Sequence, residues 1–214
     1  MTSTSGLLIN KKQFFPTQLL AFCNNLNFKK MNKKIANYVI EQSKKNPDNK
    51  TFSLGGHGWH SDINLTNLDY DWSKELHAMI IGACSAFAGR DLFEEKYILE
   101  TWAIKLAKGG YSNYHSHPGF RLSGVYYVKV PSTCDEKSGS IAFPDTRAGA
   151  MGSTFEMPTL NFKASEGEGL VFESWLPHYV TPHNGDECRI SVSWNIIWED
   201  LAKDSAPPWE DIAK

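Results

Sequence analysis

The stretch GLVFESWLPHYVTPHNGDECRISVSWNIIW, residues 169–198, contains two segments with the composition of β-strands, separated by a polar turn. Successive side chains of a strand point to opposite faces, so the second segment has one apolar and one polar face. The apolar face holds Ile190, Val192, Trp194 and Ile196, and the polar face holds Arg189, Ser191, Ser193 and Asn195. A polar face turned inward costs free energy unless an anionic or hydrogen-bonding group lies against it. The stretch therefore predicts a strand with one polar face, which suits an anionic or hydrogen-bonding group if that face is turned inward.

Other segments after residue 95 have the same alternating or β-branched composition, and clusters of Gly, Pro, Asn or Asp separate them. These segments are 97–106, 121–130, 139–143, 169–172 and 189–198. They follow helical segments instead of alternating with them. This order predicts a mainly β protein with flanking helices, built as a double-stranded β-helix of the jelly-roll, cupin-like type.

The first part of the chain reads as mainly helical. Residues 31–46 form a polar helical segment, and residues 72–88 carry apolar side chains at helical spacing, with Asp71 expected to cap the start and Gly89 the end. We expect one domain over residues 1–214, in which a helical part of about 1–95 packs on a jelly-roll core of about 96–200.

Composition restricts the class of protein. Aromatic residues make up 13% of the 214 residues, which suits a sandwich or barrel with a broad apolar interior, and the net charge of −2 argues against nonspecific nucleic-acid binding. The four cysteines are scattered, as expected in a reducing compartment. The apolar run at 78–89 is too short to span a bilayer, and the N-terminus lacks the basic region of a secretory signal. We expect a cytoplasmic protein with no membrane partner.

The stretch YSNYHSHPGF, residues 111–120, places two histidines one residue apart. If it is the end of a strand, the imidazoles of His115 and His117 emerge on one face and suit a metal ion. The alternative is a surface loop with both rings in solvent. His57 and His60 in GGHGWHS (55–61), and His183, are interpreted as loop residues, with a role of the 55–61 segment in covering a site as the alternative.

Taken together, these motifs resemble the iron(II)- and 2-oxoglutarate-dependent dioxygenases. HSHP is followed by LSGVYYV, GSIAFPD, WLPHYV and RISVSWN, an order similar to that of small bacterial and phage members related to the prolyl-hydroxylase-like branch. The resemblance covers roughly residues 97–198 and extends weakly to FPT at 15–17 and GHGWHS at 56–61. Each motif alone is weak, and the combination is specific.

The resemblance implies a role for each matching residue. His115 and His178 match the two histidine ligands of Fe(II), and Arg189 matches the arginine that binds the far carboxylate of 2-oxoglutarate by a bidentate, charge-assisted contact. Ser191 and Tyr126 match further donors to that carboxylate.

His117 departs from the family pattern, which has Asp or Glu at this position. A neutral imidazole leaves the Fe(II) site more positive by about one charge than a carboxylate would. The favoured interpretation is a site of three histidines, His115, His117 and His178. The alternatives are that Asp145 supplies a carboxylate, or that two protein ligands suffice.

The resemblance implies an oxygenase that hydroxylates a substrate while it converts 2-oxoglutarate to succinate and CO2. One alternative is a cupin-type metalloenzyme that does not use 2-oxoglutarate, and another is a noncatalytic jelly-roll binding module. The substrate is expected to be a small molecule, peptide or protein, with nucleic acid disfavoured, and the sequence does not identify it.

Overall fold

The computed structural model describes residues 2–4, 7–9, 16–25, 28–49, 51, 53–62, 64–147 and 158–198. Its helices are α1 (Phe28–Lys45) and α2 (Asp71–Ala88), with short 3-10 helices η1 (Leu65–Asn67) and η2 (Leu92–Glu94). Its strands are β1 (Thr2–Thr4), β2 (Leu7–Ile9), β3 (Leu19–Cys23), β4 (Leu54–Gly55), β5 (Gly58–His60), β6 (Tyr97–Leu106), β7 (Tyr111–His115), β8 (Leu122–Lys129), β9 (Ile141–Pro144), β10 (Thr159–Phe162), β11 (Glu168–Glu173), β12 (His178–Val180) and β13 (Arg189–Trp198).

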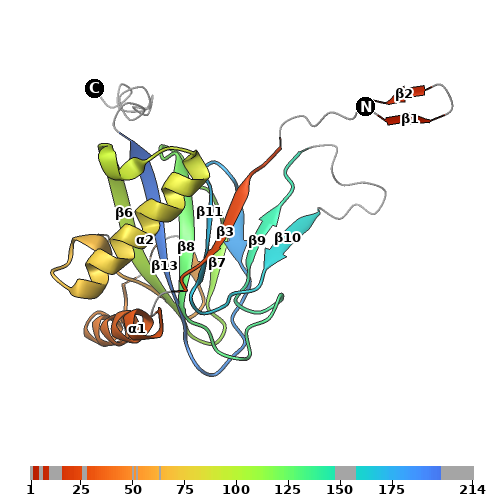
Figure 1. The fold of residues 1–214 in the computed structure, drawn as a ribbon. Helices are drawn as coiled ribbons and strands as arrows, with labels where there is room; N and C mark the ends of the chain where they lie inside the picture. Colours follow the sequence, from red (N-terminus) through yellow and green to blue (C-terminus); the bar gives the residue numbers. More distant parts are fainter. Residues whose placement is uncertain are drawn as a thin grey trace, which may run out of the picture.

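The described strands form two main sheets, in which every pairing is antiparallel (Figure 1). The larger sheet has the order β3-β11-β8-β13-β6-β5, and the smaller sheet has the order β10-β9-β12-β7-β4. Strands β1 and β2 form a separate pair. The order interleaves strands that are distant in the chain, as a jelly roll requires. The predicted fold class is confirmed.

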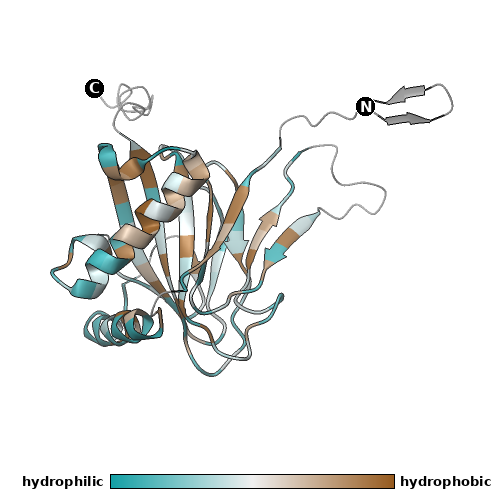
Figure 2. Ribbon diagram, in the orientation of Figure 1, coloured by the Kyte–Doolittle hydropathy of each residue, from teal (hydrophilic) through white to brown (hydrophobic). Residues whose placement is uncertain are grey.

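Both long helices cover the outer face of the larger sheet (Figure 1). The buried side chains Met31, Ile35, Leu76 and Ile80 pack in one cluster with Tyr126, Val192, Trp194 and Ile196 from the sheet. Figure 2 shows α1 largely hydrophilic on its visible side, as expected for a helix with one buried stripe. Within the described residues, neither helix combines the length and apolarity needed to cross a membrane.

The predicted helices are confirmed with small changes at their ends. Gly89 adopts a left-handed backbone (φ 65°) and its N–H bonds to the carbonyl of Ser85, which ends α2. Asp71 is not the cap: the capping position is Tyr70, whose side chain makes no capping bond, and Asp71 is the first helical residue. Its negative charge still favours the N-terminal end of the helix dipole.

The expectation that residues 1–95 only flank the β core is wrong. Strands β3 and β5 form the two edges of the larger sheet, and β4 forms one edge of the smaller sheet. The expected core boundary at about residue 96 therefore cuts through both sheets, and its end at residue 200 lies outside the described residues.

The inner faces of the two sheets enclose an apolar cluster on one side and a polar cavity on the other. The apolar cluster includes Val125, Tyr127, Phe143, Leu170 and Phe172. The polar cavity is lined by the predicted polar face of β13. This face is the only part of the strand that meets the space between the sheets, because the apolar face packs under the helices.

Candidate metal centre and its cavity

Three histidines meet in the space between the sheets. One potential ligand atom from each of His115, His117 and His178 lies within 4.8 Å of the others. The centroid of the His115 ring is 4.4 Å from that of His178 and 5.0 Å from that of His117. Among the described residues, these three side chains form the one such group that could hold a metal ion.

Two neighbouring strands of the smaller sheet bring the first pair together. His115 is the last residue of β7 and His178 the first residue of β12, and the two residues face each other in the antiparallel register. His117 lies beyond the end of β7, so the strand geometry expected from the sequence does not place it. A backbone hydrogen bond of 2.9 Å from the N–H of His117 to the carbonyl of Ser174 turns it toward the pair instead.

The surroundings of His115 and His178 favour metal binding through Nε2. Nδ1 of His115 is 2.6 Å from the carbonyl oxygen of Asn113, and Nδ1 of His178 is 2.9 Å from that of Leu176. Because a carbonyl oxygen can only accept, Nδ1 carries the proton in each ring and Nε2 keeps its lone pair. Burial lowers the pKa of His115, and burial lowers the pKa of His178 to about 3. Both rings are therefore neutral near pH 7.

His117 connects to a buried polar network. Its Nδ1 lies 3.4 Å from the side-chain amide nitrogen of Asn195, while Oδ1 of Asn195 accepts a 2.7 Å bond from Ser123, which also contacts Ser174 at 2.8 Å. Rotation of the Asn195 amide by half a turn would let Oδ1 accept from Nδ1–H of His117 and free Nε2 for a metal. Burial lowers the pKa of His117 to about 4, so this ring is also neutral.

Arg189 is a buried cation at the start of β13. It is 1% exposed, and its NH1 donates a 3.1 Å hydrogen bond to Oγ of Ser191. Its Nε has no hydrogen-bond partner, and no carboxylate among the described residues pairs with it. A buried charge without a counter-ion is costly, so this arrangement suits a site that receives an anion.

The structure places Tyr126 away from this cation, which corrects the expected donor set. The Tyr126 hydroxyl donates a 2.9 Å hydrogen bond to Asn32 of α1, on the helix side of the larger sheet. Tyr127 lies on the inner face, with the Arg189 guanidinium 5.1 Å from the centroid of its ring. The register explains the difference, because Tyr127 of β8 pairs with Ser191 on the polar face of β13, whereas Tyr126 pairs with Val192 on the face that packs under the helices.

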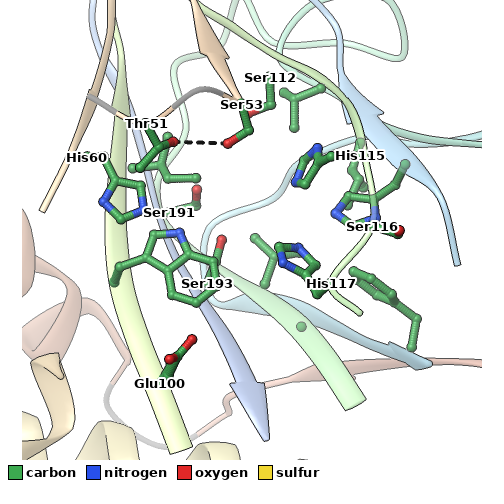
Figure 3. A pocket seen from close by; sticks show the side chains of 18 of the residues that line it. Thr51, Ser53, His60, Glu100, Ser112, His115, Ser116, His117, Ser191 and Ser193 are labelled. Atoms are coloured by element: carbon green, nitrogen blue, oxygen red, sulfur yellow. Dashed lines mark hydrogen bonds between the residues drawn. The ribbon is translucent and has the colours of Figure 1, made fainter. Parts of the chain in front are cut away.

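One cavity of about 260 Å³ is lined by both the histidine cluster and Arg189. Figure 3 shows His115 and His117 on one side of this cavity and His60, Ser191 and Ser193 on the other. His60 also lines this cavity, so its interpretation as a loop residue is wrong: it ends β5 and stacks on Trp102, with ring centroids 5.6 Å apart. Glu100 and Trp102 of β6 line the cavity too. Sequence reasoning missed Glu100, although its spacing of two from Trp102 was a signal that both share one face.

The remaining candidate residues lie elsewhere. Asp145 is outside the group that could hold a metal, and its carboxylate accepts from the Arg147 guanidinium at 2.9 Å. His57 lies in a bend and does not line the cavity. His183 is fully buried, and its Nε2 is 2.6 Å from the carbonyl oxygen of Glu187, so it is a structural residue within a loop.

Comparison with known proteins agrees with this geometry. Residues 100–195 match the family model described as "Putative 2OG-Fe(II) oxygenase". A prolyl-4-hydroxylase from Pseudomonas putida is similar in structure at 13% identity and a TM-score of 0.60, with 84% of this chain and 92% of that chain covered. The viral collagen prolyl hydroxylase of Paramecium Bursaria Chlorella virus-1, solved as a 2OG complex, is similar at 12% identity and a TM-score of 0.55, with 83% of this chain and 94% of that chain covered.

A third similar structure is the non-heme alpha ketoglutarate dependent epimerase SnoN from nogalamycin biosynthesis, at 15% identity and a TM-score of 0.59, with 85% of this chain and 76% of that chain covered. No curated protein matches the chain in sequence. At these identities the similar structures establish the fold, and the family model adds the sequence pattern of the β core. The resemblance seen in the sequence is confirmed: residues 100–195 of this chain match a model of the 2-oxoglutarate- and Fe(II)-dependent oxygenases, and oxygenases of that kind are among the structures with a similar fold.

Proposed function

We propose that this protein binds Fe(II) through His115, His117 and His178, binds 2-oxoglutarate through Arg189, and hydroxylates a carbon atom of a small-molecule or peptide substrate. One observation carries the proposal: a single cavity of about 260 Å³ holds three neutral imidazoles and a buried guanidinium without a carboxylate partner. The reaction converts 2-oxoglutarate, O2 and a substrate C–H group into succinate, CO2 and a C–OH group.

The donor set of the histidine cluster fits Fe(II). Imidazole nitrogen is a suitable ligand for Fe(II), and two of the rings have the tautomer fixed by a backbone carbonyl, as metal-binding histidines commonly do. When bound, iron supplies the redox chemistry that couples decarboxylation of 2-oxoglutarate to oxidation of the substrate. The chain itself contributes the orientation of the rings and their neutral state, which burial maintains.

Arg189 and Ser191 fit a dicarboxylate whose other end lies at the histidine cluster. The guanidinium offers a free Nε–H, and its NH1 is already oriented by the Ser191 hydroxyl. A carboxylate can accept two parallel bonds from a guanidinium, an interaction that Lys would replace poorly. Tyr127, whose buried hydroxyl has no hydrogen-bond partner among the described residues, takes the place that the sequence assigned to Tyr126.

The substitution of His117 for the usual carboxylate is compatible with this function. Three imidazoles leave the metal with its full charge of +2, and the carboxylate of 2-oxoglutarate that is not paired with Arg189 would offset part of it. A cupin-type enzyme without 2-oxoglutarate would leave the buried Arg189 without an anion.

The proposal is tested by measuring turnover of 2-oxoglutarate. The purified protein with Fe(II), 2-oxoglutarate and O2 is expected to form succinate, at least slowly and without substrate, while His178→Ala is expected to form none above background because it loses a metal ligand. Far-ultraviolet circular dichroism controls for folding of the variant. Equal succinate formation by wild type, His178→Ala and a protein-free control would contradict the proposal.

A further inference from the structure

Glu100 is a carboxylate in the cavity with no partner in the part of the chain that the structure describes. It is half-buried, lines the cavity, and forms no ion pair or hydrogen bond with any described residue. In the register of β6 and β13 it faces Asn195, whose side-chain amide lies 3.4 Å from His117. Figure 3 shows Glu100 at the end of the cavity opposite to Thr51 and Ser53. Glu100 is therefore the neighbour, on the adjacent strand, of the residue whose amide contacts His117.

The cavity is polarised along β13. Arg189 pairs with Leu106 and Asn195 pairs with Glu100, so the backbone positions of the cation and the carboxylate are separated by six residues of strand, about 20 Å. Of the described residues that line the cavity, Glu100 is the one carboxylate and Arg189 the one guanidinium or amine. Under the proposed function Arg189 is used by 2-oxoglutarate, which leaves Glu100 as the charged group that faces a substrate.

An aromatic wall lies next to this carboxylate. Trp102 is two residues from Glu100 on the same face of β6, and its ring centroid is 5.9 Å from that of His117. His60 stacks on Trp102 with an interplanar angle of 16°. The face of an indole attracts cations through its quadrupole. Burial lowers the pKa of His60, so its ring adds no positive charge that would oppose a cation near pH 7.

Arg121, a cation near this end of the sheet, is already engaged. Arg121 directly precedes β8, and its NH1 is 3.0 Å from the carboxylate of Glu173. It therefore does not neutralise Glu100, whose carboxylate remains free for a ligand.

We propose that Glu100 and Trp102 form a subsite for a positively charged group of the substrate, such as an amine, ammonium or guanidinium. The inference rests on the proposed function, because it assumes that Arg189 is occupied by 2-oxoglutarate. It identifies the substrate as a cationic compound or a basic peptide. The carboxylate and the indole face bind the charged group, and this fixes which carbon of the substrate lies at the histidine cluster.

The test uses three probes of nearly equal size: benzylammonium, benzyl alcohol and benzoate. Each is titrated anaerobically by calorimetry into the protein with Fe(II) and 2-oxoglutarate present. Wild type is compared with Glu100→Gln, which keeps the shape and removes the charge, and with Glu75→Gln, which makes the same change on the exposed face of α2. Benzylammonium is expected to bind wild type and Glu75→Gln equally, and Glu100→Gln about tenfold more weakly. Benzyl alcohol is expected to bind all three proteins alike, and benzoate more weakly than benzylammonium.

Three results would overturn the inference: no binding of benzylammonium to wild type at millimolar concentration, equal binding by wild type and Glu100→Gln, or loss of iron from Glu100→Gln, which would make Glu100 part of the metal site. The absorption spectrum of the same samples separates this inference from the proposed function. Charge transfer between Fe(II) and 2-oxoglutarate without cation selectivity defeats only the inference, whereas cation selectivity without charge transfer defeats the proposed function.

Discussion

At the scale of single residues, His117 is the unusual member of the site. The sequence revealed it by its spacing from His115, although β7 ends before it and the bond to Ser174 is what turns it inward. Replacement by Asp restores the usual carboxylate and is expected to retain Fe(II). Replacement by Ala is expected to weaken Fe(II) binding by roughly 10–100-fold, the range seen when metal ligands lose their supporting contacts. Equilibrium competition with a chelator measures both affinities, and an unchanged value for His117→Ala would point to a site of two histidines.

Asn195 is a residue-scale feature that sequence reasoning placed on the polar face but did not connect to the metal. Its amide contacts His117 and is itself oriented by Ser123. Asn195→Ala is expected to weaken Fe(II) binding by about tenfold, because the His117 ring loses the group that sets its tautomer. Ser193→Ala serves as a control on the same face. Equal loss of affinity in both variants would show that the Asn195 contact has no specific role.

At the scale of elements, strands β8 and β13 decide which of two adjacent tyrosines lies on the inner face beside Arg189. Tyr127→Phe is expected to weaken 2-oxoglutarate binding by roughly fivefold, the value of one hydrogen bond of about 1 kcal/mol. Tyr126→Phe is the matched control: it is expected to leave 2-oxoglutarate binding unchanged and to lower the free energy of unfolding by about 1 kcal/mol through the lost bond to Asn32. Binding titrations and urea denaturation measure the two effects, and a reversed pattern would contradict the register.

The same element explains what the sequence could and could not predict. The alternation along β13 is long and unambiguous, so both faces of this strand were assigned correctly, and Arg189 and Ser191 lie in the cavity. The orientation of β8 follows from its pairing with β13, and because β8 is buried on both faces its own sequence does not show which side chains face inward. Strands β4, β5 and β12 contain two or three residues each, too few for a periodic signal.

At the scale of the whole molecule, the buried histidines make stability depend on pH. Burial lowers the pKa of His117 to about 4 and that of His178 to about 3, from 6.5 for an unperturbed imidazole. Between pH 4 and pH 6.5 the unfolded chain binds more protons at these two histidines than the folded protein does, so the free energy of unfolding rises with pH. The metal-free protein is expected to lose stability as the pH falls from 6.5 toward 4, with no contribution from these groups above 6.5.

Urea midpoints measured from pH 7 to pH 4.5 test this dependence. The double variant His117→Gln/His178→Gln removes both titrating rings and is expected to show a shallower decline than wild type. Parallel declines in the two proteins would mean that groups other than His117 and His178 control the acid sensitivity.

The most direct test of the whole account is an anaerobic titration of the protein with Fe(II) and 2-oxoglutarate, followed by visible absorption. A keto acid that chelates Fe(II) gives a metal-to-ligand charge-transfer band, so wild type is expected to develop this band with saturation at one equivalent of each. In Arg189→Ala the iron is expected to remain bound, while the concentration of 2-oxoglutarate needed for the band rises by roughly 30-fold or more, because a buried charge-assisted contact is worth about 2–5 kcal/mol. Absence of the band in wild type that retains iron would contradict the assignment of this cavity to Fe(II) and 2-oxoglutarate.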